Sequence, residues 1–171
     1  MKNKTPEIDL AKSAIFAGIP ESKLAKISAV IKLVDFPVNY TVMKEGETGG
    51  SMYILLDGEV EVSKSLVLKS SGATVDPRDK SLMRLSSKSQ PFFGEMSLFD
   101  RESVRTATVR AVTPCKFAVI DLAEFIKLAE SDHEIGYRTF LNISWVLSDR
   151  LTRTNNDLLK VTTALGLALE R

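Results

Sequence analysis

The sequence predicts a mainly β domain with flanking helices, built as an antiparallel barrel or sandwich. Between residues 31 and 121 it has many short segments rich in β-branched and aromatic residues, with no helical pattern between them. Such a run favours antiparallel strands over a parallel sheet, which needs helical crossovers. Helical spacing before and after this region predicts a helix on each side of it. A chain of 171 residues has room for one domain and an appended element.

Residues 1–30 form the first segment, in which apolar residues recur at helical spacing on both sides of Gly18. Pro20 is well placed to open a second short helix, because proline is favoured in the first turn. Residues 31–121 form the β region. The expected strands are KLVDF, YTVMK, SMYILLD, EVEVSK, SLMRLS, VRTATVRAV and CKFAVID.

A polar stretch between residues 64 and 80, rich in small residues, predicts a long or partly disordered hairpin connection. Residues 122–171 form the helical C-terminal segment. It has a short helix in AEFIKLAES and then a long helix over 132–171, with Asp132 as its expected N-cap.

The long helix carries a heptad pattern with mostly apolar residues along one seam. This pattern predicts a helix that packs on its own barrel at first and on a partner helix later, so we expect a homodimer. A helix lying wholly on its own domain is the alternative. The a and d positions are Tyr137, Phe140, Ser144, Leu147, Leu151, Thr154, Leu158, Val161, Leu165 and Ala168.

Composition and charge exclude several classes of function. Lys and Arg number 23 against 22 Asp and Glu, a net charge of +1 that gives no global attraction to nucleic acid or an anionic membrane. The sole cysteine, Cys115, excludes an internal disulfide and lies in an apolar run typical of a core. The N-terminus has no apolar stretch of secretory length, and no run is long enough to span a membrane. We therefore expect a cytoplasmic protein.

The chain also lacks the residues for common catalytic sites. His133 is the only histidine, so the nitrogen and thiolate ligands of a zinc or non-haem iron site cannot be assembled. This argues against a barrel-type metalloenzyme of the cupin kind. No nucleophile has an evident base nearby, and we expect no metal, no cofactor and no enzymatic activity.

The segment FFGEMSLFDRESVRTATVRA, residues 92–111, predicts two charges directed inward. Glu95 lies in an otherwise apolar turn, and Arg105 precedes alternating apolar residues that predict the buried face of a strand. A buried arginine needs a partner. That partner can be Glu95, as a salt bridge, or a bound anion.

The neighbouring residues favour the anion. Arginine binds phosphate in bidentate fashion, Thr106 adds a hydroxyl donor, and a helical turn begun by Glu95 adds the backbone N–H groups of Met96 and Ser97. Glu95 would then accept a bond from a sugar hydroxyl, since a carboxylate repels phosphate. Acceptor and donors together predict a site for a ribose phosphate.

These residues also carry a family resemblance. G-E-x-x-L-F from Gly94, followed by R-T-A-x-V-R-A from Arg105, resembles the phosphate-binding cassette of cyclic-nucleotide-binding domains, especially those of the catabolite activator (cAMP receptor) protein family. Upstream, KEGETGGSMYILLDGEVEV resembles that family's paired strands, with turn glycines at Gly46 and Gly58. The resemblance covers about residues 14–157. It implies an antiparallel β-roll or jelly-roll barrel, with the cassette at residues 92–107, followed by a long helix.

For the cassette the resemblance implies specific roles. A cyclic phosphate would be held by Arg105, Thr106 and the backbone of Met96 and Ser97, in the turn that follows Gly94. Glu95 would accept a hydrogen bond from the ribose 2′-hydroxyl.

Outside the cassette, the resemblance implies that Val62 and Met83 line the barrel pocket. On the long helix, Thr154 and Asn155 fall at the positions that close over the base, with Arg150 one turn earlier. Ligand occupancy would thereby be coupled to the position of the helix.

The chain departs from the family pattern in two places. Residues 64–90 are longer than the usual hairpin, and SQPF stands where Gly-Asp is usual. The family's winged helix-turn-helix does not follow the long helix in this chain, so we expect no direct DNA binding.

The leading hypothesis is a cyclic-nucleotide sensor that binds cAMP, with cGMP as the other possible ligand, and signals to an unidentified downstream protein. The alternative is an interaction module that kept the barrel but binds no nucleotide, with Glu95 and Arg105 paired to each other.

Overall fold

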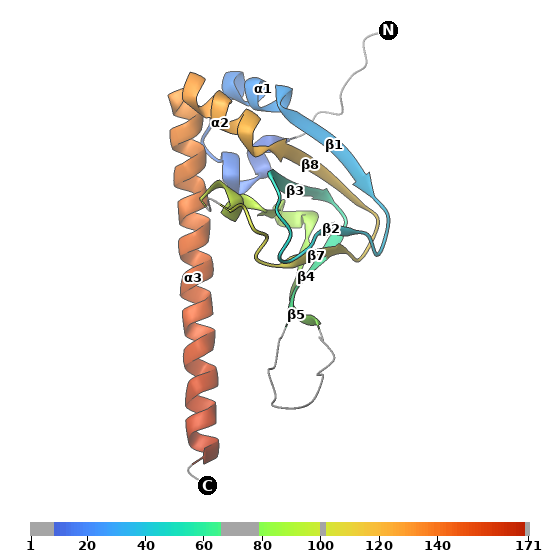
Figure 1. Ribbon diagram of the computed structural model, residues 1–171. Helices are drawn as coiled ribbons and strands as arrows, with labels where there is room; N and C mark the ends of the chain where they lie inside the picture. The colour runs from blue at the N-terminus through green and yellow to red at the C-terminus, as the bar shows by residue number, and fades with distance from the viewer. Residues whose placement is uncertain (1–8, 66–78, 100–101, 170–171) are drawn as a thin grey trace.

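The computed structural model describes residues 9–65, 79–99 and 102–169. Two four-stranded sheets form a β-roll, with strand orders β1-β8-β3-β6 and β2-β7-β4-β5, and each pairing in them is antiparallel. Helices lie at one end of the roll, and a long helix runs down its side (Figure 1). This architecture confirms the predicted fold. The strands are β1 (Ile31–Phe36), β2 (Thr41–Met43), β3 (Ser51–Asp57), β4 (Glu59–Ser65), β5 (Asp79–Ser86), β6 (Phe92–Phe93), β7 (Thr108–Ala111) and β8 (Cys115–Asp121).

The central strand β3 is buried on both faces, as its nearly continuous apolar sequence suggests. Successive side chains alternate between faces, so Ile54 joins the core beneath the helices while Leu55 joins the core between the sheets. The same division occurs on β8, where Ile120 faces the helices and Phe117 faces the second sheet. The first sheet therefore links both cores and fixes the helices relative to the barrel.

The strand expected in VRTATVRAV begins later than predicted. β7 starts at Thr108, and Val109 and Ala111 are buried while Ala107 is half-buried. Arg105 lies ahead of the strand, in the segment that returns from the cassette. The expected 64–80 connection joins the hairpin of β4 and β5, and its residues 66–78 lie outside the described part of the chain.

The N-terminal segment begins with two short 3₁₀ turns, η1 (Leu10–Lys12) and η2 (Ala14–Phe16), followed by α1 (Glu21–Ala29). Gly18 makes the turn between η2 and α1 with φ 73°. The amide nitrogen Nδ2 of Asn142, on the long helix, donates to the carbonyls of Ile15 at 3.1 Å and Ala17 at 2.9 Å. These bonds attach the N-terminal segment to the long helix.

The C-terminal helices are α2 (Leu122–Ser131) and α3 (His133–Leu169). The Asp121 side chain caps α2 by accepting from the N–H groups of Ala123 and Glu124. Gly136 lets the two helices approach closely, since a Cβ there would lie 3.0 Å from that of Ala129.

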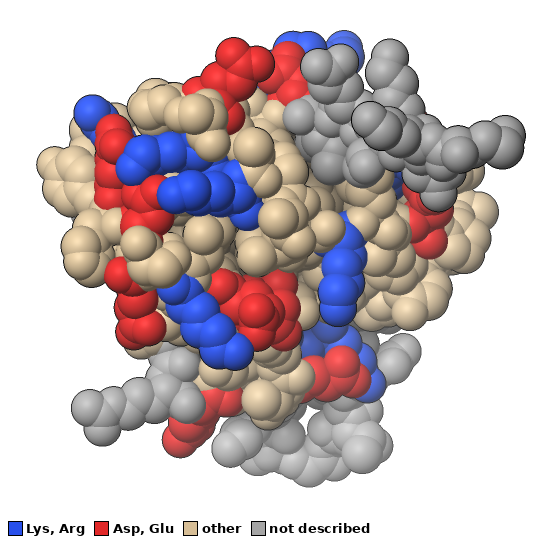
Figure 2. All heavy atoms as spheres, turned by 90° about the horizontal axis from the view of Figure 1, so that it is seen from above, with Lys and Arg blue, Asp and Glu red and all other residues tan. Residues whose placement is uncertain are grey.

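Asp132, between α2 and α3, joins α1 to this elbow. Its carboxylate accepts from the Nζ of Lys23 at 2.6 Å and of Lys26 at 2.8 Å. These bonds hold the pKa of Asp132 well below its usual range. Charges of both signs are intermixed on the surface seen from this end of the molecule (Figure 2).

The described residues contain neither a membrane-spanning helix nor a cluster of metal-ligating side chains. None of the helices there is both long and apolar enough to cross a membrane. Within the same residues, no three histidine, cysteine or acidic side chains come together as a metal site would require.

Candidate functional site

The cassette begins where β6 ends in a tight turn. Gly94 has φ 84° and is followed by a 3₁₀ turn, η4 (Glu95–Leu98). A Cβ on Gly94 would lie 2.7 Å from both Arg105 Nη1 and the Ser51 carbonyl oxygen, so the turn requires glycine. The first N–H groups of such a turn have no acceptor within it and are available to an anion.

Both inward charges are buried, with 2% of Glu95 and 5% of Arg105 exposed. They do not bind each other: each has a different partner, so the predicted alternative of a Glu95–Arg105 salt bridge is absent from this structure.

The guanidinium of Arg105 donates to three oxygen atoms of the chain. Nη1 donates to the Gly94 carbonyl at 3.3 Å and to Ser97 Oγ at 3.2 Å, and Nη2 donates to the Ser51 carbonyl at 2.8 Å. Its Cζ also lies 5.9 Å from the centre of the Tyr53 ring. Burial lowers the pKa of Arg105, although an arginine stays protonated at neutral pH.

Glu95 is bound by the long helix. Its Oε1 accepts from Nη1 of Arg150 at 2.7 Å, while Nη2 of Arg150 donates to the Phe92 carbonyl at 2.9 Å. The Arg150 guanidinium also lies over the Phe92 ring, 5.3 Å from its centre. Burial raises the pKa of the Glu95 carboxyl, and the positive charge of Arg150 opposes that rise. Arg150 thus connects α3 directly to the cassette.

The structure brings only some of the predicted residues together. Gly94, Glu95, Ser97, Arg105 and Arg150 surround one site. Met96 and Thr106 lie beside it with exposed side chains.

The remaining predicted residues lie on the second sheet and on the outer part of α3. Val62 and Met83 are cross-strand partners on β4 and β5; Val62 is half-buried and packs on the core between the sheets, whereas Met83 is 53% exposed. Thr154 and Asn155 are exposed on α3, and the Thr154 hydroxyl donates to the Arg150 carbonyl at 2.9 Å. The helix positions assigned to the base therefore face solvent in this structure.

The segment before β3 contributes to the site. This contribution was not predicted from the sequence. A hollow of about 150 Å³ lies beside Arg105, and its lining includes Thr48, Gly49, Ser51 and Tyr53. The Ser51 carbonyl accepts a hydrogen bond from the Arg105 guanidinium, and a Cβ on Gly49 would overlap that guanidinium. The Gly49-Gly50 pair was the available sequence signal, since paired glycines often mark a close approach of backbone to another group.

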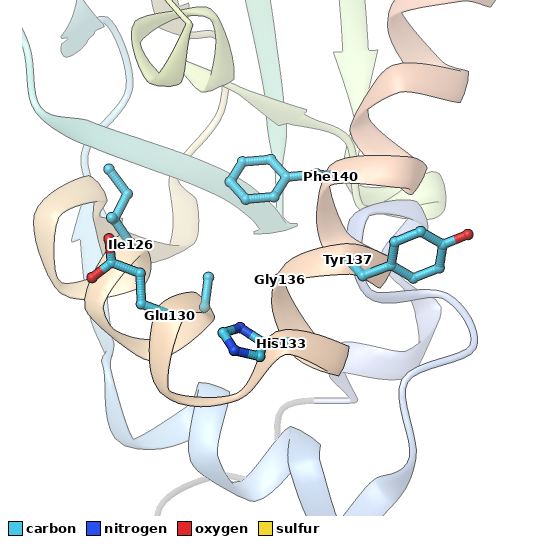
Figure 3. Close-up of a pocket in the computed structure, with 7 residues that line it drawn as sticks. Ile126, Glu130, His133, Gly136, Tyr137 and Phe140 are labelled. Atoms are coloured by element: carbon cyan, nitrogen blue, oxygen red, sulfur yellow. The ribbon is translucent and has the colours of Figure 1, made fainter.

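A larger hollow of about 350 Å³ lies at the elbow of α2 and α3. Figure 3 shows the ring of Phe140 directed toward α2 and the ring of Tyr137 directed away from it. Its lining is mainly apolar and includes no lysine or arginine, so it lacks the donors that a phosphate needs. The cassette is the better candidate for anion binding.

Comparison with known proteins agrees with this geometry. Residues 33–132 match the cyclic nucleotide-binding domain family. The chain is 30% identical over 149 residues to the CRP-like cAMP-activated global transcriptional regulator of Mycobacterium tuberculosis, covering 87% of this chain and 60% of that protein. The match therefore spans less than two thirds of the regulator.

Solved structures share the fold. The catabolite activator protein of Thermus thermophilus superposes with a TM-score of 0.72 at 19% identity, covering 88% of this chain and 63% of that one. The c-di-GMP-responsive global regulator CLP of Xanthomonas campestris superposes with a TM-score of 0.66 at 24% identity, covering 80% of this chain and 62% of that one. The family match, together with the cassette between β6 and β7, shows that this chain belongs to the cyclic nucleotide-binding domain family.

Proposed function

We propose that the protein is a non-enzymatic sensor that binds cAMP and transmits its binding through α3. One observation carries this proposal: Glu95 and Arg105 are both buried in the cassette, yet each keeps hydrogen-bonding capacity and neither neutralises the other by direct contact. Glu95 is paired with Arg150, whereas Arg105 forms no ion pair with another described residue. Burying a cation without a counter-ion is costly, and a bound phosphate would offset this cost.

The cyclic phosphate would lie between Arg105 and the first turn of η4. A guanidinium carries five N–H donors, and three hydrogen bonds to the chain account for only part of them. The backbone N–H groups of Met96 and Ser97 and the Thr106 hydroxyl would supply the remaining donors.

The ribose 2′-hydroxyl would donate to Glu95. A carboxylate has two oxygen atoms, each with two lone pairs, so Glu95 can accept from the ribose while Oε1 keeps its bond to Arg150. Ligand and α3 would then be held by the same side chain. This shared acceptor provides the coupling, because the ligand binds more tightly when α3 is docked.

The choice of base concerns the part of α3 beyond Arg150. Thr154 and Asn155 lie one turn beyond Arg150 and would reach the base only after α3 shifts or a second subunit approaches. The M. tuberculosis relative is described as cAMP-activated, which supports adenine. The X. campestris neighbour is described as responsive to c-di-GMP, so the shared fold alone does not fix the ligand.

We expect calorimetric titration of the chain to give saturable binding of cAMP and weaker binding of cGMP. Competition between the two nucleotides in one titration would establish which of them binds with the higher affinity. A thermal shift provides the parallel measurement, since ligand at a hundred times its Kd stabilises the folded state by about 2.7 kcal/mol. Absence of heat with either nucleotide at millimolar concentration would contradict the proposal and favour an interaction module without a ligand.

We further infer that α3 pairs with a second copy. At 37 residues α3 is about 55 Å long, and its buried residues end at Ile143. Figure 1 shows it continuing past the barrel. Its large apolar side chains from Leu151 onward are exposed by 58% or more, which is unfavourable in water unless a partner covers them. They include Leu151, Leu158, Val161 and Leu165.

Light scattering at two concentrations is expected to detect this dimer. Leu158→Glu should weaken it, because a charge would enter the apolar seam. Leu167→Glu is the matched control: Leu167 is 64% exposed but lies outside the a and d positions, and its substitution should leave the dimer intact. A parent that stays monomeric with and without nucleotide would contradict the partner helix.

A further inference from the structure

The guanidinium of Arg105 occupies a slot between two glycines. Gly94 lies on one side, on the cassette, and Gly49 lies on the other, in the loop before β3. A Cβ on Gly49 would overlap Nε and Nη2 of Arg105 and would come within 2.5 Å of Cζ. Real Cβ atoms do not approach other atoms so closely, so the observed position of the guanidinium depends on the absence of a side chain at residue 49.

The loop cannot easily move away from the guanidinium. Its backbone is hydrogen-bonded to the segment that carries Arg105: Gly46 N–H donates to the Arg105 carbonyl at 2.9 Å, Arg105 N–H to the Glu47 carbonyl at 2.9 Å, and Gly49 N–H to the Ser103 carbonyl at 3.0 Å. An isolated bridge also pairs Thr48 with Val104. These bonds fix the distance between residue 49 and the arginine, so a side chain added at Gly49 would displace the guanidinium and not the loop.

Three acceptors complete the slot and set the orientation of the guanidinium. The carbonyls of Ser51 and Gly94 and the hydroxyl of Ser97 each accept from it, and Ser97 is itself 7% exposed. A guanidinium held in this way loses little conformational freedom when it binds an anion, which favours affinity.

We propose that Gly49 is a positioning residue for recognition of the cyclic phosphate: it leaves the space in which Arg105 is oriented before the ligand arrives. This inference rests on the proposed function, since it assigns a role in the same site. It adds a residue from outside the cassette, separated from Arg105 in sequence and brought to it by the fold.

The neighbouring Gly50 provides a matched control. A Cβ on Gly50 would have no atom within 4 Å, and neither Gly49 nor Gly50 has a positive φ, so alanine is compatible with the backbone at both positions. We expect Gly49→Ala to weaken cAMP binding about tenfold or more and Gly50→Ala to bind as the parent does. Equal affinities of the two variants would overturn the proposal.

The two phosphorothioate diastereomers of cAMP separate positioning from general damage to the loop. Each replaces a different exocyclic oxygen by sulfur, so the ratio of their affinities reports where the guanidinium lies relative to the phosphate. Gly49→Ala should change this ratio, whereas a loop that was merely destabilised would weaken both diastereomers equally. An unchanged ratio would count against positioning.

Arg105→Leu provides a second check that also covers a failure to fold. Leucine ends at Cδ and has no atom at the positions of Nε, Cζ or Nη2, so Gly49→Ala should have a much smaller effect on thermal stability in the Arg105→Leu background. If Gly49→Ala alone unfolds the protein, the double variant should recover the fold. If Gly49→Ala lowers thermal stability as much without the arginine at residue 105 as it does in the parent, the proposal is overturned. Absence of binding by the parent would instead contradict the proposed function.

Discussion

Arg105→Leu is expected to weaken cAMP binding by about a hundredfold or more while the protein stays folded. The variant loses charge-assisted hydrogen bonds to the phosphate, each worth roughly 1.5–3 kcal/mol, and about 1.4 kcal/mol corresponds to a tenfold change in affinity. It also leaves the carbonyls of Ser51 and Gly94 without their donor, at a cost of about 1–3 kcal/mol in stability. Removal of a buried charge offsets part of that cost. Calorimetry and thermal unfolding measure the two effects separately.

Arg110→Leu is the matched control for this variant. Arg110 lies on β7, five residues along the chain, and its side chain is exposed to solvent. The same chemical change there should leave affinity and stability close to those of the parent. If Arg105→Leu binds cAMP as well as Arg110→Leu does, Arg105 does not bind the phosphate.

Much of the cassette was predictable because its signals are local. The residues after Gly94 predicted a helical turn begun by Glu95, which the structure has as η4. Period-two alternation indicated that Val109 and Ala111 are buried, and they are. The runs SMYILLD and CKFAVID likewise predicted two strands, and the structure has them as β3 and β8.

The partners of the two charges could not be predicted in this way. Glu95 binds Arg150 across 55 residues of sequence, and Arg105 binds the Ser51 carbonyl across 54. Backbone carbonyls carry no residue-type signal, so nothing in the sequence marked Ser51 as an acceptor. The two-residue strand β6 is too short to show an alternation of apolar and polar residues, so the sequence did not predict it.

The arrangement of these partners suggests how one site serves two purposes. Arg105 is held by the barrel, through Ser51 and the cassette, and is therefore fixed before ligand binds. Glu95 is held by α3 through Arg150, so the environment of its carboxylate depends on the position of that helix. A ligand that contacts both charges would join the barrel to the helix. The Arg150–Glu95 ion pair is thus the connection whose loss should have the largest effect on α3.

Arg150→Gln is expected to destabilise the protein and to loosen α3. The variant leaves the buried Glu95 carboxylate without its cation and removes the bond to the Phe92 carbonyl. Because the Arg150 side chain is itself 42% exposed, solvent already screens the pair, and we expect a loss of about 1–2 kcal/mol in the free energy of unfolding. Hydrogen exchange should become faster in α3 from Ile143 onward. Arg153→Gln is the control, since Arg153 is 76% exposed and its pairing with Asp149 is worth only a few tenths of a kcal/mol.

The pH dependence of Arg150→Gln distinguishes a lost ion pair from lost packing. Burial already raises the pKa of Glu95 in the parent, and removal of the opposing positive charge raises it further. Between the unfolded value near 4.5 and this raised folded value, the native state binds more protons than the unfolded state. The free energy of unfolding therefore falls as pH rises through that window and recovers as pH is lowered through it. Urea unfolding of parent and variant at several pH values should show the difference between them shrinking toward acid pH. A constant difference would mean that Arg150 stabilises α3 through its contact with Phe92 and not through Glu95.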